Sequence, residues 1–317
     1  MNSLTRTLAL TTIAGVAVAG CSPADETPES DSLIVTAAFY PLEYIATHVG
    51  DDHVEVRTVT QPGIDPHDAE LSPAAVREMR ESDVILYVDG FQPAVDAAVA
   101  EMEDITLINV EDYIEFREAE VHGHEGEDEV HEDEVHEEDG HEDEHGDEDP
   151  HFWLDPSLYA ELAPVVADTL AGLDADNANA YETQSAALTD DLLALDEEFS
   201  TTLAACERDV IVVGHEAFGY MTDAYGLEQV GMAGLSPDAE PSPSRIREVR
   251  EIAEHEGITT IYFETLVDSS VSETFANDLN LDTAVLDPIE GLVNDEDDYR
   301  SVMERNLDAL AAGLGCN

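Results

Sequence analysis

The sequence predicts an α/β protein of two lobes, each with a mostly parallel sheet flanked by helices, joined by a long rigid backbone helix. Two observations lead to this fold class. Short apolar, β-branched runs alternate with segments of helical periodicity in both halves of the chain, and a stretch of purely helical spacing separates the halves. With 317 residues and a 43% apolar fraction, the chain can build two cores.

The first half begins with a β-rich run and continues with alternating strands and helices, except that no helix is predicted between its last two strands. Pro41 at a first helical position and Gly50 at a helix end delimit a helix, and Ser72 followed by proline caps another that runs towards Glu81. The apolar run Val84–Val88 is typical of a buried parallel strand. Strands are expected at 33–39, 53–60, 84–88 and 105–110.

The second half repeats this pattern. We expect helices over 217–225 and 242–257, a further helix before the fourth strand, and a closing helix. The expected strands are 209–213, 228–232, 259–263 and 283–286. Alternation of this kind favours a second parallel sheet with helices on both faces.

The connector between the halves is helical. Asp155 followed by proline opens one helix, and a longer one is expected from about Ala175 to Leu203. Its apolar residues keep one face: Tyr181, Leu188, Leu192, Leu195, Phe199 and Leu203. The predicted organisation is an N-terminal lobe (33–155, including an acidic His-rich loop at 117–149), a connector (156–205) and a C-terminal lobe (206–317).

The N-terminal segment indicates the compartment. A single charge, Arg6, precedes the apolar run Leu8–Ala19, which is too short to span a bilayer as a folded helix. The run ends at Cys21 in a pattern that resembles a bacterial lipoprotein signal, with residues 22–32 as a tether. We therefore expect an extracytoplasmic domain held at the membrane by a lipid on Cys21; the alternative is a plain secretory peptide with an incidental cysteine.

The charge balance excludes two classes of partner. The chain has 75 acidic residues against 11 basic ones, all of them arginine, for a formal net charge of −64. Such a field repels nucleic acid and rules out binding to membranes through a polybasic surface. Widespread carboxylates suit a high-salt habitat, but ordinary acidity in a secreted protein accounts for them equally well.

Two further cysteines, Cys206 and Cys316, are candidates for a disulfide. An oxidising compartment favours the bridge, which would close a loop of 110 residues. Two buried free thiols are the alternative.

Four side chains stand out as candidate metal ligands. His67, His151 and His215 lie in loops beside predicted strands or helices, and Asp287 follows a predicted strand. Because loops at the carboxyl ends of parallel strands line the ligand crevice, these residues can meet there. Three neutral imidazoles and a carboxylate suit a tetrahedral Zn²⁺ ion.

Three motifs connect these residues to a known family. They are PGxDPHxxE at 62–70, PHxWLDP at 150–156 and GHxAFGY at 214–220. Over the mature chain the sequence resembles the metal-binding lipoproteins of ABC importers (cluster A-I solute-binding proteins), most closely the zinc-specific ZnuA branch. The resemblance implies metal ligation by His67, His151 and His215, with Asp287 or water as the fourth ligand.

The same resemblance bears on the metal and on the acidic loop. Manganese members carry Glu where this chain has His215, which favours zinc, although Glu216 next to it leaves a Glu-ligated arrangement open.

Between Glu118 and Asp149 there are 18 acidic and no basic residues. The histidines there are expected to collect zinc weakly, the alternative being a solvated tether: His122, His124, His131, His136, His141 and His145.

The sequence thus predicts a non-enzymatic, monomeric protein that captures Zn²⁺ and delivers it to an ABC permease. One alternative is a manganese importer subunit or surface adhesin of the same fold. The other is a zinc hydrolase with Glu216 or Glu264 as general base.

Overall fold

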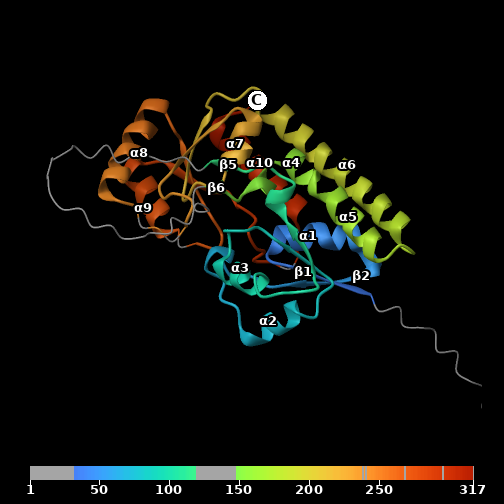
Figure 1. Cartoon of the computed structure of the whole chain (residues 1–317). Coiled ribbons are helices and arrows are strands. Elements are labelled where there is room, and N and C mark those ends of the chain that lie inside the picture. Colours follow the sequence, from blue (N-terminus) through green and yellow to red (C-terminus); the bar gives the residue numbers. More distant parts are fainter. Residues whose placement is uncertain are drawn as a thin grey trace, which may run out of the picture. The chain divides into compact units, whose positions relative to one another are not determined.

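The structure is a computed structural model that describes residues 32–118, 148–237, 239, 241–267, 269–294 and 296–316. Ser32–Asn317 forms one compact unit that contains two four-stranded parallel sheets (Figure 1). The lipidation candidate Cys21 and the six histidines of the acidic loop lie outside the described residues. No described helix has the length and apolar character that a membrane span requires.

The first sheet defines the N-terminal lobe, with strand order β2-β1-β3-β4. Its strands are β1 (Leu33–Ala37), β2 (Val54–Thr58), β3 (Val84–Tyr87) and β4 (Thr106–Asn109). Its helices are α1 (Tyr40–Gly50), α2 (Pro73–Met79) and α3 (Pro93–Val99). The Ser72 hydroxyl caps α2 by accepting from the Ala75 N–H, as predicted. Helix α3 is not among the predicted elements. Seven residues alone show no helical period, and α3 has neither the serine cap that begins α2 nor the glycine that ends α7.

The second sheet defines the C-terminal lobe, with order β10-β9-β7-β8. Its strands are β7 (Val210–Val213), β8 (Glu228–Gly231), β9 (Thr260–Phe263) and β10 (Asp282–Val285). Its helices are α7 (Gly219–Tyr225), α8 (Pro243–Glu256), α9 (Ser270–Leu279) and α10 (Tyr299–Leu314). Strand β7 is buried on both faces, since Ile211 and Val213 join the main core while Val210 and Val212 join a smaller core. This burial explains its uninterrupted apolar sequence.

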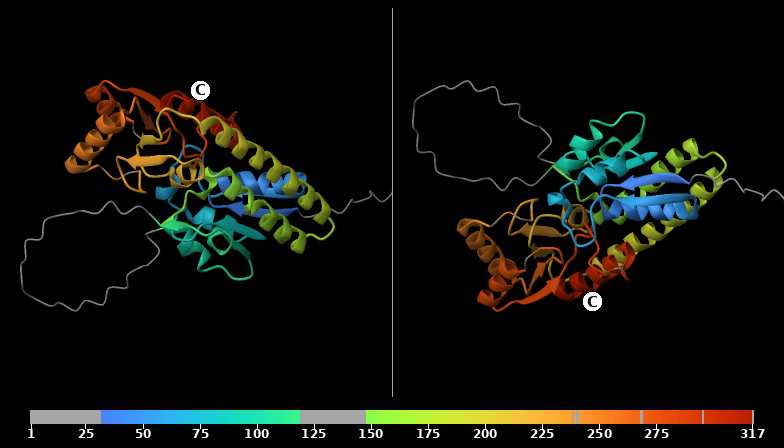
Figure 2. Two further views of the ribbon diagram at one scale, coloured as in Figure 1. Left: turned by 90° about the horizontal axis from the view of Figure 1, so that it is seen from above. Right: turned by 90° about the horizontal axis from the view of Figure 1, so that it is seen from below.

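Helices connect the two lobes. They are α4 (Pro156–Ala160), α5 (Leu162–Leu173) and α6 (Ala178–Leu203). The Asp155 carboxylate caps α4 by accepting from the N–H groups of Ser157 and Leu158. Helix α6 packs against α1, α4, α5 and α10, and Figure 2 shows it beside α5. All six apolar positions predicted for its inner face are buried.

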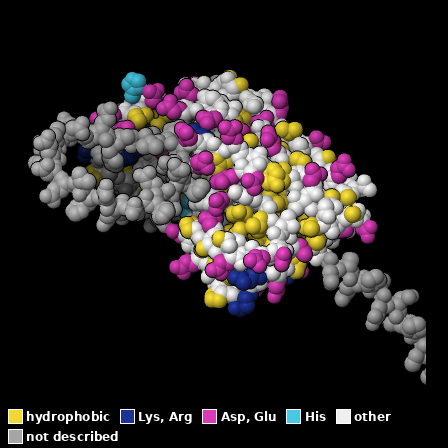
Figure 3. All heavy atoms as spheres, viewed as in Figure 1, with side chains coloured by type: hydrophobic (Ala, Val, Ile, Leu, Met, Phe, Trp, Pro, Cys, Tyr) yellow, Lys and Arg dark blue, Asp and Glu magenta, His cyan; other side chains and the backbone are white. Residues whose placement is uncertain are grey.

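A short antiparallel hairpin precedes the connector. Its strands are β5 (Arg117–Glu118) and β6 (Glu148–Asp149), the two ends of the acidic segment. The predicted disulfide between Cys206 and Cys316 is present and joins the segment after α6 to the second residue after α10. Acidic side chains are spread over the face shown in Figure 3.

The sheet topology places two loops where a ligand site is expected. In the second sheet, β7 and β9 are neighbours from which the chain continues in opposite directions, to β8 and to β10. The carboxyl ends of such strands border a crevice. His215 follows β7 and Glu264 follows β9, so both side chains begin at this crevice.

Candidate metal centre

His67 belongs to the N-terminal lobe and stands in a 3₁₀ turn, Pro66–Asp68, that follows β2. The Asp65 carboxylate accepts a hydrogen bond of 2.9 Å from the His67 backbone N–H. The buried Gln92 amide donates to the carbonyl of Pro66 at 3.2 Å and to the Thr60 hydroxyl at 3.0 Å. The turn is therefore fixed from both sides, and Pro66 further restricts its backbone.

His151 lies two residues after the end of strand β6 and is fully buried. Asp149 Oδ1 accepts from the His151 backbone N–H at 3.0 Å and lies 2.7 Å from His151 Nδ1. A carboxylate on Nδ1 fixes the tautomer that leaves Nε2 free to bind a metal. Arg117 Nη1 donates to the other oxygen of Asp149 at 3.2 Å, so this buried carboxylate is also neutralised.

His215 follows strand β7 and is fully buried as well. Its Nδ1 lies 2.7 Å from Glu264 Oε2, and its backbone N–H donates to Glu264 Oε1 at 3.2 Å. A Cβ on Gly214 would stand 2.7 Å from the same Oε1 atom. Glycine before His215 therefore lets Glu264 approach closely and orient the ring.

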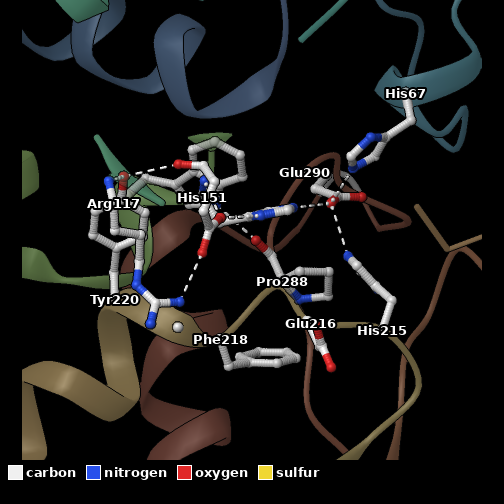
Figure 4. A network of polar contacts seen from close by, with 12 residues as sticks. His67, Arg117, His151, His215, Glu216, Phe218, Tyr220, Pro288 and Glu290 are labelled. Atoms are coloured by element: carbon white, nitrogen blue, oxygen red, sulfur yellow. Dashed lines mark hydrogen bonds and ion pairs between the residues drawn. The ribbon is translucent and has the colours of Figure 1, made fainter. Parts of the chain in front are cut away.

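The three imidazoles point at one atom, Glu290 Oε1 (Figure 4). The Nε2 atoms of His67, His151 and His215 lie 3.2, 2.9 and 3.5 Å from it. One ligand atom from each of the four residues lies within 4.8 Å of the others. The structure thus brings together three predicted histidines from separate loops, together with a carboxylate that was not predicted.

Asp287, the predicted fourth ligand, does not belong to the cluster that the three histidines form. The Asp287 carboxylate accepts from the Ile289 N–H at 2.8 Å, within its own loop, and from the Thr265 hydroxyl at 2.6 Å, in the loop that follows β9. Glu290 enters the site instead, three residues later. The sequence shows two carboxylates after β10, Asp287 and Glu290, and their spacing does not tell which one faces the histidines. The backbone direction between them depends on Ile289, which is left-handed at φ 58°.

Glu216 does not take part in the centre, although it follows His215 in the chain. Its carboxylate points away from the rings (Figure 4) and lies 3.3 Å from Arg245 Nη2. The Glu-ligated arrangement that the sequence left open is therefore not adopted.

The electrostatics of the centre are strongly coupled. Burial disfavours a charged His215, but Glu264 and Glu290 outweigh it and raise the pKa of His215 to about 10. Burial likewise opposes the charge on His151, while Asp149 and Glu290 raise the pKa of its imidazole. Burial opposes the Glu290 charge as well, yet the three histidines hold the pKa of this carboxyl well below its usual range. The centre therefore favours an anionic oxygen among cationic partners.

This donor set can hold a divalent metal. Three imidazole nitrogens and one carboxylate oxygen are typical Zn²⁺ ligands in a tetrahedral geometry. Two of the histidines carry a carboxylate on Nδ1, the usual support of a metal-binding imidazole. His67 differs because its side chain is 16% exposed, beside a cavity of about 140 Å³ that it lines with Asp89, Glu111 and Glu148.

Comparisons with known proteins find relatives whose names record zinc uptake or zinc binding. The high-affinity zinc uptake system protein ZnuA of Bacillus subtilis is 31% identical over 294 residues, which cover 90% of this chain and 89% of that protein. The zinc-binding lipoprotein AdcA of Streptococcus pneumoniae is 30% identical over 96% of this chain, which spans only 60% of AdcA.

Solved structures show the same fold. The Zn(II)-bound ZnuA-like domain of S. pneumoniae AdcA is 28% identical in sequence and superposes with a TM-score of 0.71. The match covers 89% of this chain and 99% of that domain. Residues 35–313 match the family described as ZnuA, zinc-uptake complex component A, periplasmic. The chain belongs to the ZnuA family.

Proposed function

We propose that this protein captures Zn²⁺ with His67, His151, His215 and Glu290 and delivers it to the permease of an ABC importer. The observation that carries the proposal is the convergence of three Nε2 atoms, supplied by three separate segments, on a single carboxylate oxygen. Zn²⁺ is the transported cargo in this account, so its binding must be selective and reversible.

The donor set supports zinc over manganese. Mn²⁺ prefers oxygen ligands, whereas imidazole suits zinc. Three of the four donors are nitrogen, and the additional carboxylate at Glu216 is held by Arg245. The manganese alternative is therefore not favoured.

The side of entry is supported by exposure and charge. His67 is the partly exposed member of the four, and the cavity beside it carries Asp89, Glu111 and Glu148. Carboxylates around a recess attract cations and raise their local concentration. We infer that the ion reaches His67 first and the buried histidines afterwards.

The family and the N-terminal sequence support a location outside the cytoplasm. A lipid on Cys21 would hold the protein outside the cytoplasm, where a permease can receive the ion. The histidines of the acidic loop, His122 to His145, would supply weak zinc binding there. We propose a monomer for this role.

A hydrolase of the same donor set is not favoured. A general base has to reach a metal-bound water or a substrate. Glu264 contacts the ring and backbone of His215, and Glu216 is paired with Arg245, so neither candidate is available. The site supports binding and release.

The proposal is tested by calorimetric titration of the double variant His67→Ala/His215→Ala with Zn²⁺. The tight step should disappear, while weak binding by the acidic loop persists. The variant His53→Ala/His255→Ala is a matched control that removes two histidines outside the centre and should retain the tight step. An unchanged tight step in the first variant refutes the site, and Mn²⁺ that displaces Zn²⁺ at equal concentration refutes the choice of metal.

A further inference from the structure

We propose that Trp153 and Asp287 are positioning residues for Glu290, fixing the turn that aims its carboxylate at the histidines. The proposal rests on the function proposed above and identifies what holds the fourth ligand. The turn comprises Asp287, Pro288, Ile289 and Glu290, which follow strand β10.

The backbone of the turn is strained at Ile289. This residue has φ 58° and is fully buried. A β-branched side chain rarely adopts the left-handed region, and such a conformation persists only where the surroundings enforce it. The surroundings therefore have to supply specific contacts that keep Glu290 directed into the centre.

Asp287 supplies the contacts from within the C-terminal lobe. Its carboxylate accepts from the strained Ile289 N–H at 2.8 Å and from the Thr265 hydroxyl at 2.6 Å. Its backbone N–H donates to Asn306 Oδ1 at 2.9 Å, and the Asn306 amide donates to its carbonyl at 2.7 Å. Since Thr265 follows β9 and Asn306 belongs to α10, Asp287 attaches the turn to two elements of the C-terminal lobe.

Trp153 supplies the contact from outside that lobe. The indole N–H of this fully buried residue donates to the Pro288 carbonyl at 2.7 Å. Trp153 follows His151 by two residues, and Pro288 precedes Glu290 by two residues. One hydrogen bond therefore joins the segment of His151 to the segment of Glu290. Of the three histidines, His151 also lies nearest to Glu290, with 2.9 Å between its Nε2 and Glu290 Oε1.

These contacts have a consequence for metal binding. With the hydrogen bond in place, His151 and Glu290 keep their mutual spacing and the ion meets a preorganised pair. Without it, the strained turn can relax and Glu290 samples other positions. Loss of a residue that orients a ligand typically lowers metal affinity by about 10–100-fold.

The test uses Trp153→Phe, which keeps an aromatic ring beside His151 and removes the N–H donor. Tyr159→Phe is the matched control, because it removes another buried hydrogen bond, from the Tyr159 hydroxyl to the Pro41 carbonyl at 2.6 Å, away from the turn. Zn²⁺ affinity is measured by competition with a chelator, and the coordination of Co²⁺ by its visible absorption spectrum. We expect Trp153→Phe to weaken Zn²⁺ by about tenfold and alter the Co²⁺ spectrum, with neither change in Tyr159→Phe.

A second pair of variants separates positioning from general damage to the fold. Asp287→Ala removes both acceptors and should behave as Trp153→Phe does, whereas Asp287→Asn keeps an acceptor for the Ile289 N–H and should restore the wild-type spectrum. Wild-type affinity and spectrum in both Trp153→Phe and Asp287→Ala overturn the positioning role and leave the zinc site intact. Absence of tight zinc binding in the wild-type protein overturns both proposals.

Discussion

At the scale of single residues, each histidine of the proposed centre is held by contacts on the side away from Glu290. Asp149 holds Nδ1 of His151, Glu264 holds Nδ1 of His215, and Gln92 holds the turn of His67. Glu264 and Gln92 cannot be identified from a single sequence, because a partner 49 or 26 positions away shows no pattern that links it to the histidine segment it contacts. Asp149 lies only two residues before His151, but the sequence does not show that its side chain turns back to the ring. The histidines could be predicted, since unusual motifs surround each of them.

Glu290→Gln tests the fourth ligand at this scale. The amide has the same shape but no charge, and we expect Zn²⁺ affinity to fall by at least about tenfold, the equivalent of 1.4 kcal/mol. Competition with a chelator gives the value. The control is Glu216→Gln, also buried and adjacent to His215 but paired with Arg245, which should leave affinity unchanged. Equal losses in both variants would show that the effect is not ligation.

The titration of His215 gives a second residue-scale prediction. The pKa of the His215 imidazole is about 10, above the ordinary 6.5. In the metal-free protein its charged form therefore contributes fully to the free energy of unfolding below about pH 6.5, and this contribution is lost as the pH rises towards 10. Metal binds only neutral imidazole, so Zn²⁺ must displace the proton.

The measurable result is opposite for stability and for affinity. Between pH 6 and 8, the apparent Zn²⁺ affinity should rise by about tenfold per pH unit for each proton displaced. Over the same range, chemical denaturation of the metal-free protein should show a free energy of unfolding that falls as the pH rises. An affinity independent of pH would contradict the proton displacement.

At the scale of elements, the β5–β6 hairpin connects the N-terminal half to helix α7. Arg117 Nε donates to Asp223 at 3.1 Å. The Arg117 backbone N–H donates to the Tyr220 hydroxyl at 3.0 Å, and that hydroxyl donates to the Asp149 carbonyl at 2.8 Å (Figure 4). A Cβ on Gly219 would collide with the Arg117 guanidinium. The last two residues of the GHxAFGY motif, Gly219 and Tyr220, thus make room for and bind the β5–β6 hairpin, a role that the sequence did not reveal.

Arg117→Gln tests the hairpin. It leaves the buried Asp149 without its cation, and we expect a loss of about 1–3 kcal/mol in the free energy of unfolding together with weaker Zn²⁺ binding. Arg300→Gln is the control, since Arg300 pairs with three carboxylates that are 46–51% exposed; it should cost no more than about 1 kcal/mol and leave affinity unchanged. Denaturant melts and chelator competition measure both. Unaltered zinc affinity in Arg117→Gln would exclude a role in orienting His151.

At the scale of the whole molecule, most of the fold could be predicted because it depends on periodicity. The strands of both sheets and the inner face of α6 lie where the apolar pattern placed them. The short helix α3 and the break at Glu161 that separates α4 from α5 carry too little periodic signal. The choice of Glu290 over Asp287 depends on one left-handed residue, which the sequence does not mark.

The disulfide gives a prediction at this scale. Cys206→Ser/Cys316→Ser opens a loop of 110 residues and should lower the free energy of unfolding by about 2–5 kcal/mol. Because neither cysteine belongs to the metal centre, Zn²⁺ affinity should stay at the wild-type value. Denaturant melts and chelator competition check the two parts. A large loss of affinity would mean that the bridge also arranges the lobes around the ion.

A crystal structure of the zinc-loaded protein, with anomalous scattering recorded on both sides of the zinc absorption edge, measures the position of the ion itself. The strongest anomalous peak should lie about 2.0–2.2 Å from Nε2 of His67, His151 and His215 and from a carboxylate oxygen of Glu290. A dominant peak at any other group of side chains, or one that binds Asp287 in place of Glu290, would contradict the account.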